Sequence, residues 1–176
     1  MRGLFSFPNP VNEISARLVA TGALIQAGII IVFDRLGYPG VWWLSLVLAY
    51  GFVARVLTGP TLSPLGQLVT RVITPALNRP AKLVPGPPKR FAQGMGAAFS
   101  ISAAVLALVF HQYTAAVIVL GALAVAATLE AVFAFCLGCT IFQALMRIGV
   151  VPEAVCEECN NIWARQRVAQ RVGQSA

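Results

Sequence analysis

Residues 114–135 read TAAVIVLGALAVAATLEAVFAF, and Glu130 is the one charged residue in this run. A helix needs about 20 mainly apolar residues to cross the roughly 30 Å hydrocarbon core of a bilayer. Three earlier runs also meet this requirement, at residues 16–33, 41–57 and 91–110. The pattern predicts an all-α integral membrane protein, a four-helix bundle with four membrane-spanning helices.

The composition of the whole chain agrees with this prediction. Hydrophobic residues make up 58% of the chain and charged residues 11%, whereas about 25% of the residues in a soluble domain are charged. The first run is longer than the apolar core of a signal peptide, and no A-x-A cleavage site follows it. We expect a single membrane domain, residues 1–159, and a polar C-terminal tail, residues 160–176. Asp34 and Arg35 are expected to pair at the membrane surface.

Lysine and arginine residues flank the four runs asymmetrically, and such residues favour the cytoplasmic side of a membrane. If both termini are cytoplasmic, Arg35 is the one basic residue outside. The basic residues expected inside are Arg2, Arg17, Arg55, Arg71, Arg79, Lys82, Lys89, Arg90, Arg147, Arg165, Arg167 and Arg171. We therefore predict a multi-pass protein of the inner (plasma) membrane. Because the basic residues are scattered and no basic aromatic platform accompanies them, the net charge of +7 does not indicate nucleic-acid binding. The aromatic residues expected to form an outer belt are Tyr38, Trp42, Trp43 and Tyr113.

The segment between the second and third runs, residues 58–90, is predicted to be a long cytoplasmic loop and holds seven of the eleven prolines. Apolar residues recur at helical spacing from Leu65 to Ala76, after a capping Ser63 and a Pro64 suited to the first helical position. We expect a short interfacial helix here on the inner leaflet. An irregular loop that covers the bundle is the alternative.

Small residues recur every four positions in the third run, which lets membrane helices approach closely. These residues are Ala92, Gly96, Ser100 and Ala104. Ala122 and Ala126 form a similar row in the fourth run, in line with Glu130. We therefore expect the third and fourth helices to form a close pair.

Glu130 is costly in a bilayer unless it is neutral or paired. A structural role would place it in the bundle interior, protonated or bonded to Gln26 or Arg55. A functional role would make it a proton or substrate group in a small transporter subunit. The sequence leaves both roles open.

All four cysteines lie in two C-x-x-C pairs, Cys136 with Cys139 and Cys156 with Cys159. The spacing between the pairs is typical of tetrahedral zinc sites. A helix after Cys139 and a turn before Cys156 would let the pairs meet, with zinc pinning the tail to the bundle of a scaffold protein. An iron–sulfur cluster uses the same ligands and is the less favoured alternative.

Thiol–disulfide exchange is the competing chemistry, with Cys136 and Cys139 as the candidate catalytic residues. A permanent disulfide is not expected in the reducing cytoplasm. A helix N-terminus or a cation lowers the pKa of an attacking thiol, but the end of an apolar run offers neither to Cys136. Glu157 and Glu158 flank Cys156 and would disfavour its thiolate.

Three segments, Asn9–Glu13, Gly86–Gln93 and Phe135–Cys139, together resemble an uncharacterised family of bacterial, actinobacterial-type integral membrane proteins with a CxGC motif in the last span. The family is catalogued as a domain of unknown function. The resemblance covers most of the chain and implies a short multi-span protein associated with thioredoxin-like or rhodanese-like proteins. Many relatives carry a lysine after the second cysteine of the first pair, where this chain has Thr140.

The predicted function is that of a membrane-anchored accessory protein in thiol-redox or sulfur metabolism, which exchanges electrons or sulfane sulfur with a soluble partner through its cysteines. The two alternatives are the zinc scaffold and the transporter subunit that uses Glu130. No Ser/His/Asp set, phosphate loop or carboxylate pair indicates another reaction, and nothing in the sequence identifies a substrate.

Overall fold

The computed structural model describes residues 7–78 and 80–151. Within them, four helices are long and apolar enough to cross a membrane, if the 3-10 helix η1 (Pro39–Trp42) is joined to the helix that follows it. These helices are α1 (Glu13–Arg35), α2 (Trp43–Thr58), α5 (Gly86–Leu108) and α6 (Tyr113–Phe133). They correspond to the four predicted runs, so the prediction of an all-α membrane protein is confirmed.

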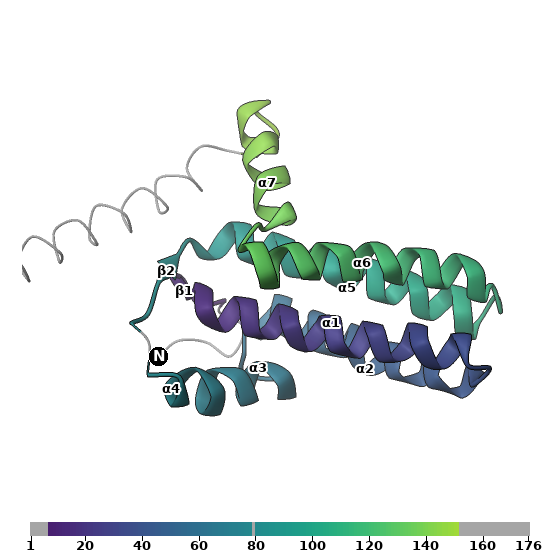
Figure 1. Cartoon of the computed structure of the whole chain (residues 1–176). Coiled ribbons are helices and arrows are strands. Elements are labelled where there is room, and N and C mark those ends of the chain that lie inside the picture. The colour runs from purple at the N-terminus through teal and green to yellow at the C-terminus, as the bar shows by residue number, and fades with distance from the viewer. Residues whose placement is uncertain (1–6, 79, 152–176) are drawn as a thin grey trace, which may run out of the picture.

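The four long helices form two layers (Figure 1). One layer contains α1 and α2 and the other contains α5 and α6, with α1 against α6 and α2 against α5. The core between the layers is built largely from alanines with a few large side chains, and Ala27, Ile30 and Leu120 are all fully buried. Such small residues let membrane helices approach closely.

The predicted contact between α5 and α6 is present, but the small residues of α5 serve other neighbours as well. A Cβ atom on Gly96 would lie 2.3 Å from the ring of Phe52 in α2. Ala92 packs against Gly138, which follows α6 in the chain. The row of small residues therefore allows α5 to pack at the centre of the protein, against several elements at once.

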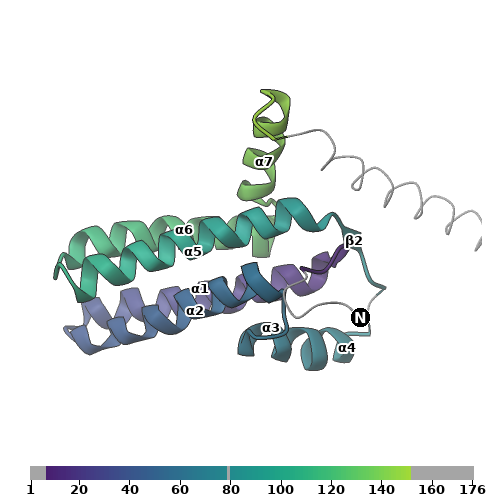
Figure 2. The same ribbon diagram turned by 180° about the vertical axis from the view of Figure 1, so that it is seen from behind.

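The long loop contains the predicted helix, which consists of α3 (Pro64–Leu68), a π-helical turn η2 (Val69–Ile73) and α4 (Thr74–Ala76). Ser63 caps it by accepting a hydrogen bond from the backbone N–H of Gly66 at 3.2 Å. The segment lies lengthwise beside α1 and α2 in both views (Figures 1 and 2). Leu65 and Val69 pack on the bundle: a Cβ atom on Gly22 of α1 would lie 2.7 Å from Leu65, and Val69 is buried. Leu68 and Val72 of the same segment are exposed.

A further helix, α7 (Leu137–Arg147), projects sideways from the bundle and lies across its long axis (Figures 1 and 2). The sequence did not predict a break between α6 and α7. We call the end of the bundle at which α1 and α5 begin, and at which α2 and α6 end, the α7 end. A two-stranded antiparallel pairing also lies there, between β1 (Val11–Asn12) and β2 (Leu83–Val84).

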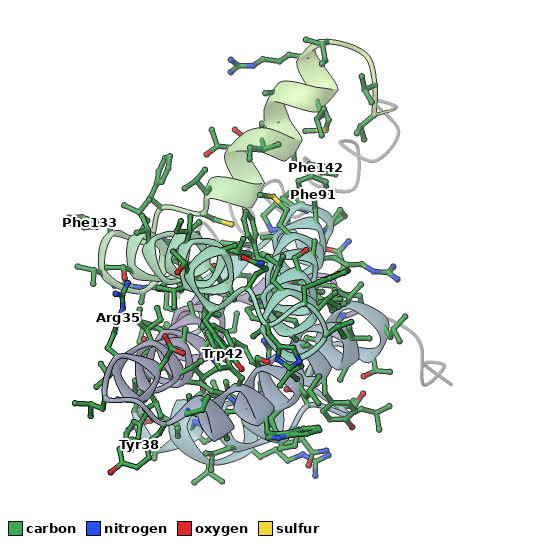
Figure 3. The ribbon with its side chains drawn as sticks, turned by 90° about the vertical axis from the view of Figure 1, so that its right-hand side faces the viewer. Arg35, Tyr38, Trp42, Phe91, Phe133 and Phe142 are labelled. Atoms are coloured by element: carbon green, nitrogen blue, oxygen red, sulfur yellow. The ribbon has the colours of Figure 1, made fainter. Side chains whose placement is uncertain are left out.

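At the opposite end of the bundle, the structure differs from two expectations, the exposed position of Trp42 and the pairing of Asp34 with Arg35. Trp42 is fully buried, and its indole Nε1 donates a hydrogen bond to Oδ1 of Asp34 at 2.8 Å. A buried indole N–H requires such an acceptor, so Trp42 is a core residue and Asp34 pairs with it rather than with Arg35. Figure 3 shows Trp42 pointing in among the helices, whereas Tyr38 points outward. Tyr38 and Trp43 remain exposed, as an aromatic belt requires.

Candidate functional site

Cys136 and Cys139 lie at the N-terminus of α7, beside the point where α6 ends. Ala134 adopts a left-handed conformation, with φ of 56°, and this turn redirects the chain out of the bundle. Cys136 is the N-cap residue of α7, and its Sγ accepts a hydrogen bond from the backbone N–H of Cys139 at 3.3 Å. The expectation that no helix N-terminus serves Cys136 is therefore wrong.

Close packing positions this turn. A Cβ atom on Gly138 would lie 2.6 Å from the Cα of Ala92, so the first turn of α7 rests directly on the backbone of α5. The rings of Phe91 and Phe142 lie next to each other, with centroids 5.7 Å apart, where α7 leaves the bundle (Figure 3). These contacts hold the two cysteines against the start of α5.

The C-terminal end of α6 is held from the other side by α1. Nε and Nη2 of Arg17 donate hydrogen bonds to the carbonyl of Ala131 at 3.1 and 2.8 Å, and Nη2 also donates to that of Val132 at 3.1 Å. The last carbonyls of a helix lack partners within the helix, so Arg17 satisfies groups that would otherwise need water. The turn that carries Cys136 thus begins from a fixed helix end.

An ion pair lies beside the cysteines. Nζ of Lys89, in the first turn of α5, is 2.6 Å from Oε1 of Glu130, in the last turn of α6, and both side chains are largely buried. The expected partners of Glu130 were Gln26 and Arg55. Gln26 instead bonds the carbonyl of Leu44. Arg55 interacts with Glu130 electrostatically, and the hydrogen bond comes from Lys89.

The two thiols have different environments. The side-chain hydrogen bond with Cys139 lowers the pKa of Cys136, and the Lys89 ammonium lowers it further, against the opposing effects of burial and Glu130. The same hydrogen bond raises the pKa of Cys139, and burial and the charge of Cys136 raise it more. Cys136 is buried and Cys139 is half-buried, and both are free thiols. The pair therefore combines a stabilised thiolate with a more accessible thiol.

The buried thiol faces a small cavity of about 60 Å³ among α1, α2, α5, α6 and the start of α7. Its polar lining comes from Glu130, Cys136 and Gln93, and its apolar lining includes Phe52 and Leu123. Cys139 is not part of this lining, so the two sulfurs belong to different surroundings.

The second cysteine pair, Cys156 and Cys159, lies outside the described residues, and so does its predicted approach to Cys139. Within residues 7–78 and 80–151, no group of three or more His, Cys, Asp or Glu side chains is arranged to hold a metal ion. The first pair alone supplies two of the four ligands that a structural zinc site needs.

Lys89 is the residue of this site that sequence reasoning missed. Lys89 was expected only to be one of the basic residues of the cytoplasmic loop, because the third run was predicted to begin at residue 91. The helix begins earlier, at Gly86, and so carries Lys89 into the bundle. Pro87 and Pro88 could have predicted this start, since proline is favoured in the first turn of a helix.

A comparison with curated proteins found no match, and a comparison with solved structures found none either. A family model described as Domain of unknown function (DUF4395) matches residues 11–147. The matched range extends from β1 to the last residue of α7, and it includes Lys89, Glu130, Cys136 and Cys139. The chain is thus a small membrane protein, and it belongs to the DUF4395 family.

Proposed function

We propose that this protein is a membrane-bound thiol–disulfide exchange protein in which Cys136 and Cys139 cycle between a dithiol and a disulfide. The observation that carries the proposal is the position of Cys136 as N-cap of α7, with its Sγ accepting the N–H of Cys139 at 3.3 Å. Helix N-termini and nearby cations stabilise a thiolate, and a C-x-x-C pair at such a terminus is suited to exchange.

The difference in exposure supports different roles for the two cysteines. Starting from the disulfide, a thiolate of a soluble partner attacks the more accessible sulfur of Cys139, and Cys136 leaves as a thiolate. A leaving thiol with a lower pKa leaves faster, and the helix N-terminus and Lys89 favour the thiolate of Cys136. Glu130 holds Lys89 in place through their ion pair.

A second thiol of the partner, once deprotonated, then attacks the partner sulfur of the mixed disulfide and releases Cys139. The partner ends as a disulfide, two electrons have passed to the Cys136 and Cys139 pair, and Cys139 takes up a proton. The reverse sequence oxidises the pair. We propose that the α7 end lies at the cytoplasmic face of the plasma membrane. A thioredoxin-like protein, which has a dithiol of its own, could carry out this exchange there. A rhodanese-like partner would instead leave sulfane sulfur on Cys139.

The test uses full-length protein in which Cys156 and Cys159 are both replaced by Ser, so that the first pair is measured alone. The protein is purified without chelator and equilibrated with graded mixtures of reduced and oxidised dithiothreitol, and its free thiols are counted by alkylation and mass spectrometry. We expect the reversible loss of two thiols. Pair variants carrying Cys136→Ser or Cys139→Ser should keep one free thiol throughout.

The roles of the two cysteines are tested by trapping with a small-molecule disulfide whose two halves separate on exchange, so that no second thiol of the reagent can release the mixed disulfide. The Cys136→Ser variant should accumulate a mixed disulfide on Cys139, and the Cys139→Ser variant should accumulate much less on the buried Cys136. Wild-type protein with one bound zinc ion per chain, and a first pair that never forms a disulfide, would favour the zinc scaffold and contradict the proposal. Added sulfur on Cys139 after incubation with a persulfide donor would identify sulfane sulfur transfer.

A further inference from the structure

A second and larger cavity lies at the α7 end, with a volume of about 190 Å³. It is lined by residues of five segments: the N-terminal segment from Phe7 to Asn12, the first half of α1, the end of α2, the segment around Gly66 and the start of α5. An apolar cavity of about 150 Å³ is large enough to hold benzene, so this one admits a somewhat larger small molecule. Its apolar lining includes Pro8, Ala16 and Val19.

Two cationic side chains, Arg55 and Lys89, contribute to the same lining. Arg55 is only 5% exposed. Its Nε donates to Oε1 of Gln93 at 2.8 Å and its Nη1 donates to Oγ of Ser63 at 3.0 Å, so both acceptors are neutral. The guanidinium also lies over the ring of Phe52, 4.5 Å from the ring centroid.

The remaining nitrogen, Nη2 of Arg55, is buried and has no hydrogen-bond partner among the described residues. A buried donor without a partner is costly, more so when it is charged. Buried charges in proteins are normally paired. This nitrogen therefore supplies, beside the shape of the cavity, a second observation that points to an anionic ligand.

The described carboxylates do not supply the missing partner. Glu13 lies 2.8 Å from Lys82, and Glu130 lies 2.6 Å from Lys89. Asp34 bonds Trp42 at the opposite end of the bundle. Arg55, Lys89 and Glu130 together leave one positive charge at the cavity, and that charge belongs to a guanidinium with unused donors.

We propose that this cavity binds a small organic anion. An oxygen of its carboxylate or phosphate group accepts the hydrogen bonds of Arg55 Nη2, and its short apolar part fills the space beside Pro8, Ala16 and Val19. Arginine favours such oxyanions because its donors match their geometry. The anion can be a free molecule or the headgroup of an anionic lipid, since the α7 end carries the ends of the membrane-spanning helices. The proposal does not depend on the chemistry of the cysteines.

The test measures binding to the full-length protein in a zwitterionic detergent, with benzoate as the anion and benzamide as an uncharged molecule of the same shape. Benzoate should raise the melting temperature in a concentration-dependent way, because a ligand that binds the folded state stabilises it, and benzamide should not. Equilibrium dialysis with labelled benzoate gives the affinity directly. Arg55→Met should weaken binding at least about tenfold, the effect of losing a charged hydrogen bond.

Two further variants separate binding from folding. Ala16→Leu fills the cavity without changing Arg55 and should also abolish benzoate binding. Arg71→Met removes an exposed arginine elsewhere at the same end and should leave binding unchanged. The proposal is overturned if benzamide binds as well as benzoate, or if Arg55→Met and Ala16→Leu bind benzoate like the wild type.

Two additional arms identify the source of the anion. Inorganic phosphate tests a free anion without an apolar part, and nanodiscs of phosphatidylglycerol are compared with nanodiscs of phosphatidylcholine to test a lipid headgroup. Retention of phosphatidylglycerol by the wild type, lost in Arg55→Met, supports the site and assigns it to lipid. The absence of binding by benzoate, phosphate and phosphatidylglycerol alike overturns the proposal.

Discussion

Lys89 and Glu130 come from helices with few charged residues: α6 contains Glu130 alone, and α5 contains Lys89 and the neighbouring Arg90. Their contact explains how an acidic residue is tolerated near the end of an apolar span. The pair also separates the two cavities, because Lys89 lines the larger one and Glu130 lines the smaller one. Gln93 lines both cavities and bonds Arg55.

The ion pair yields a stability prediction. Glu130→Leu should lower the free energy of unfolding by about 3–5 kcal/mol, because it leaves Lys89 charged and buried without its partner. Glu130→Gln should cost less, since an amide oxygen still accepts a hydrogen bond from Lys89. The double variant Lys89→Met/Glu130→Leu should recover most of the loss.

Denaturation of the detergent-solubilised variants measures these values. Lys82→Met is the control, because Lys82 is 69% exposed and its ion pair with Glu13 should contribute less than about 1 kcal/mol. Equal stability for Glu130→Leu and the wild type would show that Glu130 reaches water or lipid headgroups instead of depending on Lys89.

The two cysteines should differ in the pH dependence of their alkylation. The lowered pKa of Cys136 means that its thiolate persists to lower pH than that of a free cysteine, and is lost only as pH falls through this lowered value. The raised pKa of Cys139 delays its thiolate to higher pH. Iodoacetamide alkylation rates can be measured for each cysteine by mass spectrometry. As the pH is raised, the rate for Cys136 should begin to increase at a lower pH than the rate for Cys139.

Variants that remove one nearby charge should shift the pH profile of Cys136 alkylation in opposite directions. Lys89→Met removes a cation that favours the thiolate, so the Cys136 profile should move to higher pH, while Glu130→Gln should move it to lower pH. Lys82→Met should leave the profile in place. Identical profiles for the two cysteines would contradict the separate environments that the structure describes.

Close approach at small residues holds several elements of this protein together, and the contact of α7 with α5 is the clearest case. Gly138→Ala should destabilise the protein by about 1–3 kcal/mol, since its Cβ would lie 2.6 Å from the Cα of Ala92 and a backbone must move. Gly94→Ala is the matched control, because a Cβ there meets nothing within 4 Å. Alanine favours a helix over glycine by up to about 1 kcal/mol, so Gly94→Ala should be neutral or stabilising.

Melting curves in detergent measure both glycine variants. The Gly138→Ala variant should also expose Cys136 to faster alkylation, because the first turn of α7 can no longer rest on α5. If Gly138→Ala and Gly94→Ala are equally stable, α7 does not depend on this contact for its position.

The charge distribution over the whole molecule predicts its orientation in the membrane. Arg35 lies at the end opposite to α7, whereas the α7 end carries Arg17, Arg55, Lys89 and Arg90 close to the termini of the long helices. Basic residues favour the cytoplasmic side. We therefore expect the α7 end to be cytoplasmic.

Cysteine labelling in intact cells tests the orientation, in a background with the four native cysteines replaced by Ser. A membrane-impermeant maleimide should label Leu36→Cys and not Leu77→Cys, and both side chains are well exposed. Labelling of Leu77→Cys alone would reverse the orientation.

The membrane-spanning helices could be predicted from the sequence because apolar length is a local property. Each predicted run lies within or close to its helix, and the ends differ by a few residues where prolines or turn residues extend or shorten it. The same holds for the helix after Ser63, which cap and proline signals predict. Ala134 and the break before Cys136 could not be predicted this way, since the residues from Phe133 to Cys136 include neither glycine nor proline.

The candidate site depends on which residues meet, and the linear order of residues does not give these partners. The sequence identified Cys136, Cys139 and Glu130 as unusual groups, since thiols and carboxylates are conspicuous in an apolar chain. Packing of α5 against α2, α6 and α7 gave Glu130 its partner Lys89 and placed Cys136 at a helix N-terminus. A buried charge pairs with the nearest compensating group on the packed helices, so its partner is determined only when the bundle assembles. The cost of burying that charge can already be predicted from the sequence.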